Sequence, residues 1–115
     1  MAVTIFHNPN CGTSRNVLAA LREAGAEPRV VEYLRAGWTR SQLKELFGRM
    51  GVTPREALRV RGTPAEALGL TKPGVGDDAI IEAMVANPVL VERPIVDDGA
   101  KAALCRPADR VKAFL

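Results

Sequence analysis

The sequence predicts an α/β fold in which a mixed four-stranded sheet is flanked by helices. Two apolar runs, at residues 2–6 and 28–34, enclose a helical pattern, and this strand–helix–strand order implies parallel neighbours joined by a right-handed crossover. Farther along, two strands are expected on either side of Asp98-Gly99, the first including residues 89–91 and 95–96 and the second residues 102–104. They predict an antiparallel hairpin, because Asp-Gly is a typical hairpin turn. Residues 39–87 lie between these parts and carry helical periodicity, which predicts a helical insertion between the second and third strands.

The first strand and the first helix are predicted from apolar spacing. Residues 2–6 are mostly apolar and include β-branched side chains, which favours a buried strand. In the helix that follows, four residues fall on one face, Val17, Leu18, Leu21 and Ala24, and Gly25 suits the position just after the last turn.

The insertion is expected to be helical from its first residues. A helix over 39–50 should start at Thr39, which can form a capping box with Gln42, and should bury one apolar stripe. Two shorter helices are expected from Thr53 and Thr63, because each is followed by a proline and, three residues on, by a glutamate.

The last helix of the insertion is expected to have Asp77 or Asp78 as its cap and to be terminated by Asn87-Pro88. A final helix of the chain is expected after Pro107. Because no linker-like composition sets the insertion apart, we predict a single domain over residues 1–115.

The composition is typical of an ordinary globular protein, with 115 residues, 47% of them hydrophobic and 25% charged. No apolar run approaches the roughly 20 residues that span a bilayer, and no secretory signal is visible, so we expect a cytoplasmic protein without membrane contact. The formal charge of +3 is mild, and the scarcity of aromatic residues argues against nucleic-acid binding. Two cysteines in an unexported chain favour thiol chemistry over a structural disulfide.

Cys11 is a candidate functional residue because it lies in the predicted turn between the first strand and the first helix. Free backbone N–H groups and the positive end of the dipole at a helix N-terminus both favour an anion. Such surroundings lower the pKa of a thiol from about 8.5 to roughly 3.5–7.5. Thr13 and Ser14 can cap the helix, and their hydroxyls could also donate to a sulfur anion. The residues alone thus leave three alternatives, which are a reactive thiol, an oxyanion site and inert packing.

A resemblance to a known family begins around Cys11. The stretch resembles the active-site motif of the glutaredoxin-coupled arsenate reductases, the ArsC family with a thioredoxin-like fold, and it reads His7-Asn8-Pro9-Asn10-Cys11-Gly12-Thr13-Ser14-Arg15-Asn16. Three further segments agree with the family in order and spacing: Ala57-Leu58-Arg59, Glu92-Arg93-Pro94-Ile95-Val96 and Leu104-Cys105-Arg106-Pro107. The similarity extends from residue 2 to about residue 112, and it implies a thioredoxin-like sheet with an inserted helical layer.

The resemblance also implies roles for individual residues. Cys11 corresponds to the nucleophile, and Pro94 corresponds to a proline that is usually cis and faces the cysteine. The implied oxyanion-binding residues are Gly12, Thr13, Arg59, Arg93 and Arg106. Arginines suit this role because guanidinium forks match tetrahedral oxyanions and balance their charge.

Ser14 occupies the position where a thioredoxin-type redox site has its second cysteine. Because a single thiol cannot resolve its own adduct, the resemblance points to glutathione and glutaredoxin as external reductants, with no bound cofactor. Ser14 stays a candidate donor to the thiolate, and His7 could help to hold Cys11 as a thiolate through charge or a hydrogen bond. We expect Cys105 to be a packing residue, and we expect no metal, because one histidine and two separated cysteines offer no zinc-like spacing.

The implied function is reduction of arsenate to arsenite through a thiol–arsenate adduct on Cys11, which glutathione and glutaredoxin resolve. Phosphate and sulfate are expected to mimic the substrate. Two alternatives come from the same superfamily: a thiol-redox-sensing adaptor of the Spx type that binds RNA polymerase, and a glutathione-linked oxidoreductase with another substrate. Ser14 disfavours the adaptor, because that class usually keeps a Cys-x-x-Cys switch. A further alternative is an anion-binding module without turnover.

Overall fold

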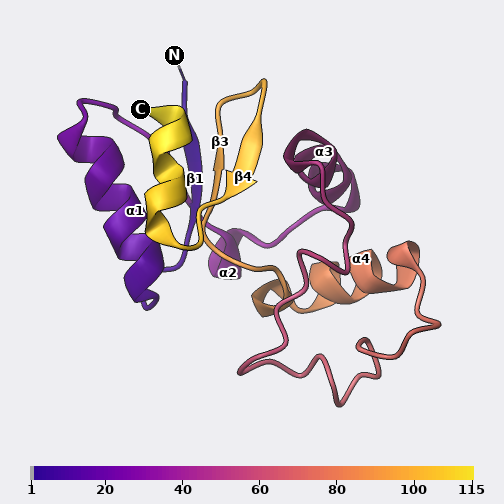
Figure 1. Cartoon of the computed structure of the whole chain (residues 1–115). Helices are drawn as coiled ribbons and strands as arrows, with labels where there is room; N and C mark the ends of the chain where they lie inside the picture. The colour runs from indigo at the N-terminus through magenta and orange to yellow at the C-terminus, as the bar shows by residue number, and fades with distance from the viewer. Residues whose placement is uncertain (1) are drawn as a thin grey trace. The chain divides into compact units, whose positions relative to one another are not determined.

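The structure, a computed structural model, describes residues 2–115 in two compact units. The sheet unit comprises the residues up to Ala36 together with Arg93–Leu115, and the inserted unit is Gly37–Glu92. The elements of the sheet unit are β1 (Thr4–His7), α1 (Gly12–Glu23), β2 (Arg29–Glu32), α2 (Tyr33–Ala36), β3 (Ile95–Asp97), β4 (Ala102–Leu104) and the 3₁₀ helix η2 (Ala108–Phe114) (Figure 1). Those of the inserted unit are α3 (Arg40–Met50), α4 (Asp77–Ala86) and the 3₁₀ helix η1 (Pro88–Leu90).

The sheet has the predicted mixed topology, with the strand order β2-β1-β3-β4. β1 pairs in parallel with β2 and antiparallel with β3, and β3 and β4 form the hairpin predicted from Asp98-Gly99. Because β3 runs antiparallel to β1, its first residue, Ile95, lies opposite Phe6 near the end of β1. The start of β3 and the loop that follows β1 therefore lie at the same end of the sheet.

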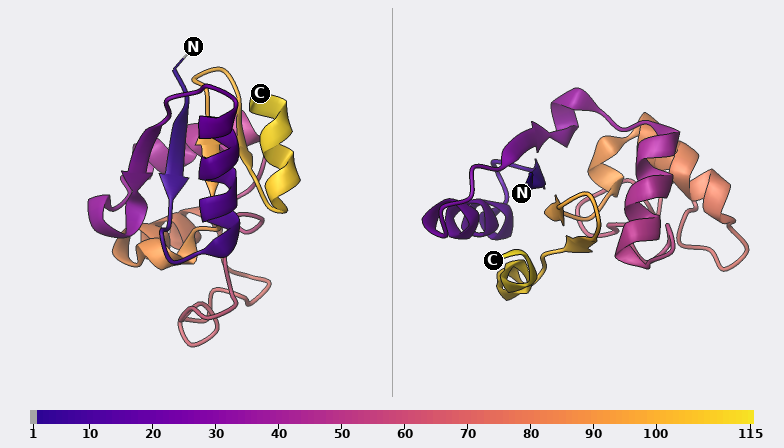
Figure 2. Two further views of the ribbon diagram at one scale, coloured as in Figure 1. Left: turned by 90° about the vertical axis from the view of Figure 1, so that its left-hand side faces the viewer. Right: turned by 90° about the horizontal axis from the view of Figure 1, so that it is seen from above.

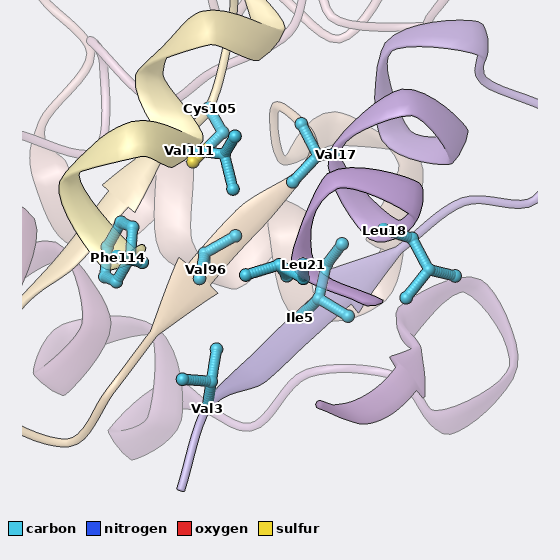
Figure 3. Packing of buried hydrophobic residues seen from close by; sticks show 9 residues of the cluster. All are labelled: Val3, Ile5, Val17, Leu18, Leu21, Val96, Cys105, Val111 and Phe114. Carbon is cyan, nitrogen blue, oxygen red and sulfur yellow. The ribbon is translucent and has the colours of Figure 1, made fainter. Parts of the chain in front are cut away.

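α1 and η2 lie side by side on one face of the sheet (Figures 1 and 2). The apolar side chains that they bury against β1, β3 and the end of β4 form one cluster (Figure 3): Val3, Ile5, Val17, Leu18, Leu21, Val96, Cys105, Val111 and Phe114. Val17 and Leu21 are fully buried, as the predicted helical face requires. This core fixes the position of α1, and with it the loop that precedes α1.

β2 ends at Glu32, two residues before the end of the predicted run. Glu32 pairs with His7, which is the last residue of β1. Beyond this point β1 offers no further strand backbone for β2 to pair with. The chain turns instead into the short helix α2, in which Tyr33 is buried and Leu34 is 43% exposed.

In the inserted unit, α3 begins and ends where the sequence predicts. The Thr39 hydroxyl accepts the N–H of Gln42 at 3.1 Å, and the Gln42 side chain accepts the N–H of Thr39 at 3.4 Å, which completes the capping box. Gly51 ends the helix with φ at 69°, a left-handed conformation that glycine adopts without steric cost.

The predicted cap of α4 is wrong. Its N-cap is Gly76 rather than Asp77 or Asp78, and no side chain caps it. Both aspartates lie in the first turn, where a negative charge interacts favourably with the helix dipole. They therefore support the helix start through charge and not through a capping hydrogen bond.

The short helices predicted from Thr53 and Thr63 are also wrong, because both segments form turns. Thr53 and Glu56 do make the reciprocal hydrogen bonds of a capping box, at 2.9 and 3.2 Å, but the helix does not continue. Leu58 instead forms an isolated β-bridge with Val91, which requires extended backbone. The capping box at Thr53 thus stabilises a single turn, and the pairing of Leu58 with Val91 prevents a second helical turn from forming.

The segment before β3 differs from the prediction as well. Residues 89–91, expected in a strand, form the end of η1 (Pro88–Leu90) and the bridge residue Val91. The peptide bond before Pro94 is cis, as the resemblance predicted, and so is the one before Pro107, which was not predicted. No helix within residues 2–115 combines the length and the apolar character needed to cross a bilayer.

Leu21→Ala should lower the free energy of unfolding by about 2–5 kcal/mol, because Leu21 is fully buried in the cluster of Figure 3 and its truncation leaves a cavity. Leu34→Ala is the control, since Leu34 is 43% exposed, and should change the free energy by no more than about 0.5 kcal/mol. Urea denaturation followed by circular dichroism measures both variants. Equal losses would contradict this packing.

Candidate active site

Cys11 is the N-cap of α1, where the sequence predicted it. Its backbone is extended (φ −103°, ψ 120°), its N–H donates to the Asn8 carbonyl at 3.0 Å, and its side chain is 7% exposed. Burial raises the pKa of the Cys11 thiol, but a hydrogen bond from the Ser14 backbone, hydrogen bonds from Arg93 and Arg106, and the charge of Arg93 lower it to about 7. The thiol is therefore about half ionised at neutral pH.

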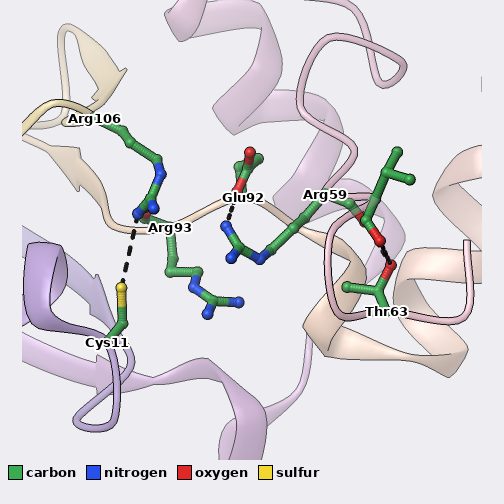
Figure 4. Close-up of polar contacts among 7 residues, drawn as sticks. Cys11, Arg59, Thr63, Glu92, Arg93 and Arg106 are labelled. Atoms are coloured by element: carbon green, nitrogen blue, oxygen red, sulfur yellow. Dashed lines mark hydrogen bonds and ion pairs between the residues drawn. The ribbon is translucent and has the colours of Figure 1, made fainter.

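Arg93 and Arg106 both approach Cys11 from the hairpin of the sheet unit. Arg93 precedes β3, and Arg106 follows β4 and places Nη1 3.8 Å from Sγ of Cys11 (Figure 4). Nη1 of Arg106 also donates to the Arg93 carbonyl at 3.4 Å. Within residues 2–115, Nε of Arg93 is buried and has no hydrogen-bond partner. The sheet unit thus joins a thiolate with two guanidinium groups, one of which keeps an unused buried donor.

The Ser14 hydroxyl does not cap α1, although the sequence allowed that role. No side chain caps α1, and Ser14, which is fully buried in its first turn, makes a 2.7 Å hydrogen bond between Oγ and Nδ1 of His7. Oγ also accepts the N–H of Asn8 at 3.1 Å. Ser14 reaches Cys11 through its backbone N–H, so its side chain acts on the loop rather than on the sulfur.

His7 contacts the site through Ser14. Burial lowers the pKa of His7, the charge of Glu32 raises it, and the charges of Arg22 and Arg15 lower it, with a lower pKa as the net result. The imidazole is therefore mostly neutral at pH 7, and the hydrogen bond to Ser14 is the contact that the structure shows for it. The bond to Ser14 connects His7 to the loop, and the groups that lower the pKa of Cys11 are Ser14, Arg93 and Arg106 rather than His7.

Asn8 shapes the loop that precedes Cys11. It is 5% exposed, its side chain accepts the N–H of Asn10 at 2.9 Å, and its backbone bonds to both Cys11 and Ser14. An asparagine two residues before a turn N–H is a recognised signal for such a bond. The signal was present, but only burial shows that Asn8 connects both ends of the Cys11 loop.

The other predicted residues occupy separate positions. Gly12 and Thr13 form the first turn of α1, next to Cys11. Arg59 belongs to the inserted unit, where its Nη1 donates to Oε1 of Glu92 at 2.8 Å (Figure 4). Cys105 is fully buried in the core, as expected, and burial raises the pKa of its thiol to about 11. Within residues 2–115, the His, Cys, Asp and Glu side chains form no group of three or more that could hold a metal ion.

The reaction of Cys11 with iodoacetamide should follow its lowered pKa. Because the thiolate is the nucleophile, the rate should fall about tenfold per pH unit well below pH 7 and level off above pH 8. Mass spectrometry of the alkylated protein across pH measures the midpoint. Cys11→Ser should show almost no labelling, since Cys105 is buried with a raised pKa. A midpoint near 8.5 in the folded wild type would contradict the proposed contacts of Cys11.

Ser14→Ala should lower the free energy of unfolding by about 1–3 kcal/mol, because the Asn8 N–H and the His7 ring lose a buried partner. The alkylation midpoint of Cys11 should stay near 7, since the donor from Ser14 is its backbone. Thr13→Ala, one residue earlier in the same turn, is the control and should leave stability within about 0.5 kcal/mol. A clear rise in the midpoint for Ser14→Ala would contradict this assignment and would show that the hydroxyl donates to the Cys11 thiolate.

Comparisons with known proteins identify the family of this chain. The model of the ArsC family matches residues 6–114. The arsenate reductase of Rhizobium meliloti (strain 1021) is 47% identical over 115 residues, which are 100% of this chain and 82% of that protein. The arsenate reductase of Escherichia coli (strain K12) is 42% identical over 98% of this chain and 80% of its own length. The solved arsenate reductase from Vibrio cholerae has the same fold, with a TM-score of 0.95 and 36% identity over 100% of this chain and 98% of its own. The chain is therefore a member of the ArsC family, with the thioredoxin-like fold of that family.

Proposed function

We propose that this protein reduces arsenate to arsenite, with Cys11 as the nucleophile. The observation that carries the proposal is the Cys11 thiol with its pKa lowered to about 7, at the N-terminus of α1 and beside Arg93 and Arg106. A thiolate, free helix N–H groups and two guanidinium groups are what attack on a tetrahedral oxyanion requires. The names of the relatives at 42–49% identity support the same substrate.

The first step joins Cys11 to arsenic. Arsenate binds to Arg93, Arg106 and the first turn of α1 at Gly12 and Thr13, and the buried Nε of Arg93 supplies a donor that no protein group uses among residues 2–115. The Cys11 thiolate forms an S–As bond as one As–O bond breaks, and the oxygen leaves as hydroxide, or as water once protonated. The same cations that stabilise the thiolate then balance the charge of the adduct.

The second step needs an external thiol, because Ser14 stands where a second cysteine would be. Glutathione forms a second S–As bond and displaces another oxygen as water. The thiolate of glutaredoxin then attacks the glutathione sulfur, so that an S–S bond forms, the bond from glutathione to arsenic breaks, and its electron pair reduces As(V) to As(III). Hydrolysis of the remaining S–As bond releases arsenite and restores Cys11. In this proposal the protein has no bound cofactor and works in the reducing cytoplasm.

Arsenate-dependent oxidation of NADPH, coupled through glutathione reductase, glutathione and glutaredoxin, tests this proposal. The wild type should turn over, and Cys11→Ser should fall to background because it loses the only thiol with a lowered pKa. Cys105→Ala is the matched control and should keep activity within about twofold, since Cys105 only packs in the core.

An inactive wild type whose Cys11 still reacts at a midpoint near 7 would overturn arsenate reduction, and a thiol sensor or a glutathione-linked oxidoreductase would then explain the site. Loss of activity in Cys105→Ala, with unchanged unfolding, would contradict the single-thiol mechanism. Omission of glutaredoxin should abolish turnover, and turnover without it would contradict the proposed reductant.

A further inference from the structure

A cavity of about 340 Å³ lies in the sheet unit beside the loop that carries Cys11. One wall is formed by residues 7–10, which are the last residue of β1 and the start of this loop. The other wall is formed by Glu32, Leu34 and Arg35, at the end of β2 and in α2. Ligand sites have volumes of roughly 300–1,000 Å³, so this Glu32–Arg35 cavity has the size of a site for a small peptide.

The wall at the end of β2 carries two opposite charges that are not used within the fold. Glu32 and Arg35 are exposed, and within residues 2–115 neither side chain forms an ion pair or a hydrogen bond. Leu34, which lies between them in the sequence, is 43% exposed and adds apolar surface. A carboxylate and a guanidinium three residues apart match a ligand that carries both an ammonium and a carboxylate, rather than a simple anion.

The cavity reaches the backbone next to the nucleophile. Asn8 and Asn10 both line it, Cys11 follows Asn10 directly, and the N–H of Cys11 donates to the Asn8 carbonyl at 3.0 Å. Neighbouring Cα atoms are about 3.8 Å apart, and three extended residues span about 10 Å. A tripeptide anchored in the cavity is therefore long enough to extend past Asn10 to Cys11.

We propose that the Glu32–Arg35 cavity binds glutathione and directs its thiol towards the adduct on Cys11. This inference rests on the proposed function, in which glutathione forms the second S–As bond. The γ-glutamyl end of glutathione carries an ammonium and a carboxylate on one carbon atom, and these groups pair with Glu32 and Arg35. The cysteine of the tripeptide then points towards the Cys11 loop, where a bound thiol attacks more readily than one from solution.

An NMR titration with S-methylglutathione tests binding without turnover, because methylation blocks the thiol and keeps the charged groups. In N–H correlation spectra of the wild type, shift changes should saturate and should be largest at residues 7–10 and 32–35. The double variant Glu32→Gln/Arg35→Gln should raise the Kd about tenfold, since each lost ion pair weakens binding by about two- to fivefold.

A modified ligand links Glu32 to one group of glutathione. S-methylglutathione with an acetylated amino group has no ammonium, so it should bind to the wild type about two- to fivefold more weakly than the parent ligand. Glu32→Gln should bring no further loss with this ligand, because the pair is already absent.

Arg22→Gln/Glu27→Gln is the matched control, because it also removes one cation and one anion from a cavity of the sheet unit. That cavity, of about 450 Å³, lies at the opposite end of the sheet, since the residues that line it precede Arg29, which pairs with Thr4 at the start of β1. The control should leave the Kd for S-methylglutathione unchanged. Thermal unfolding checks that both double variants are folded.

The coupled assay with arsenate gives the kinetic counterpart. Glu32→Gln/Arg35→Gln should raise the KM for glutathione about tenfold, and the rate should recover at saturating glutathione. Loss of the Glu32 charge lowers the pKa of His7 further, so the imidazole stays neutral and does not confound the result.

Shift changes that lie outside the cavity, or a Kd that Glu32→Gln/Arg35→Gln leaves unchanged, would overturn this inference. A wild type that binds S-methylglutathione in the cavity without reducing arsenate would overturn the proposed function alone. Turnover with the same glutathione KM in the wild type and in Glu32→Gln/Arg35→Gln would overturn only the role of the cavity. A wild type with neither binding nor turnover would overturn both.

Discussion

The stabilisation of a negative charge on Cys11 is the constraint on which the sheet unit depends. Burial alone would raise the pKa of this thiol, so the polar contacts must exceed that cost to bring it to about 7. They come from different parts of the fold, with a backbone N–H from α1 and a guanidinium from each end of the β3–β4 hairpin. The antiparallel pairing of β3 with β1 brings these parts to the same end of the sheet.

The loop before α1 holds the Cys11 sulfur beside Arg93 and Arg106. Asn8 bonds to Asn10, Cys11 and Ser14, and Ser14 bonds in turn to His7 at the end of β1. The serine at the position of a second thiol therefore has a structural use, because it anchors the loop with a buried hydroxyl. The same residue makes an external thiol necessary in the proposed reaction, so one position affects both the shape of the site and its choice of reductant.

The arginines that the resemblance groups together differ in their electrostatic state. Arg93 and Arg106 surround a sulfur that gains negative charge, and Nε of Arg93 has no partner among residues 2–115. Arg59 instead faces a carboxylate in a partly buried pair. The residues that the resemblance assigns to one role therefore differ in their contacts: Arg93 and Arg106 lie beside the Cys11 sulfur, whereas Arg59 is paired with a carboxylate.

The sequence by itself determined the features that depend on near neighbours. The capping box at Thr39, the turn at Asp98-Gly99 and the position of Cys11 before α1 each involve residues a few places apart, and all agree with the structure. Tertiary structure decided the rest, because the deciding partners are far away in the chain. The turn at Thr53 stops where Leu58 pairs with Val91, and Arg106 meets Cys11 across 95 residues. Local signals set where an element can start, and only long-range packing sets how far it continues and which charges it meets.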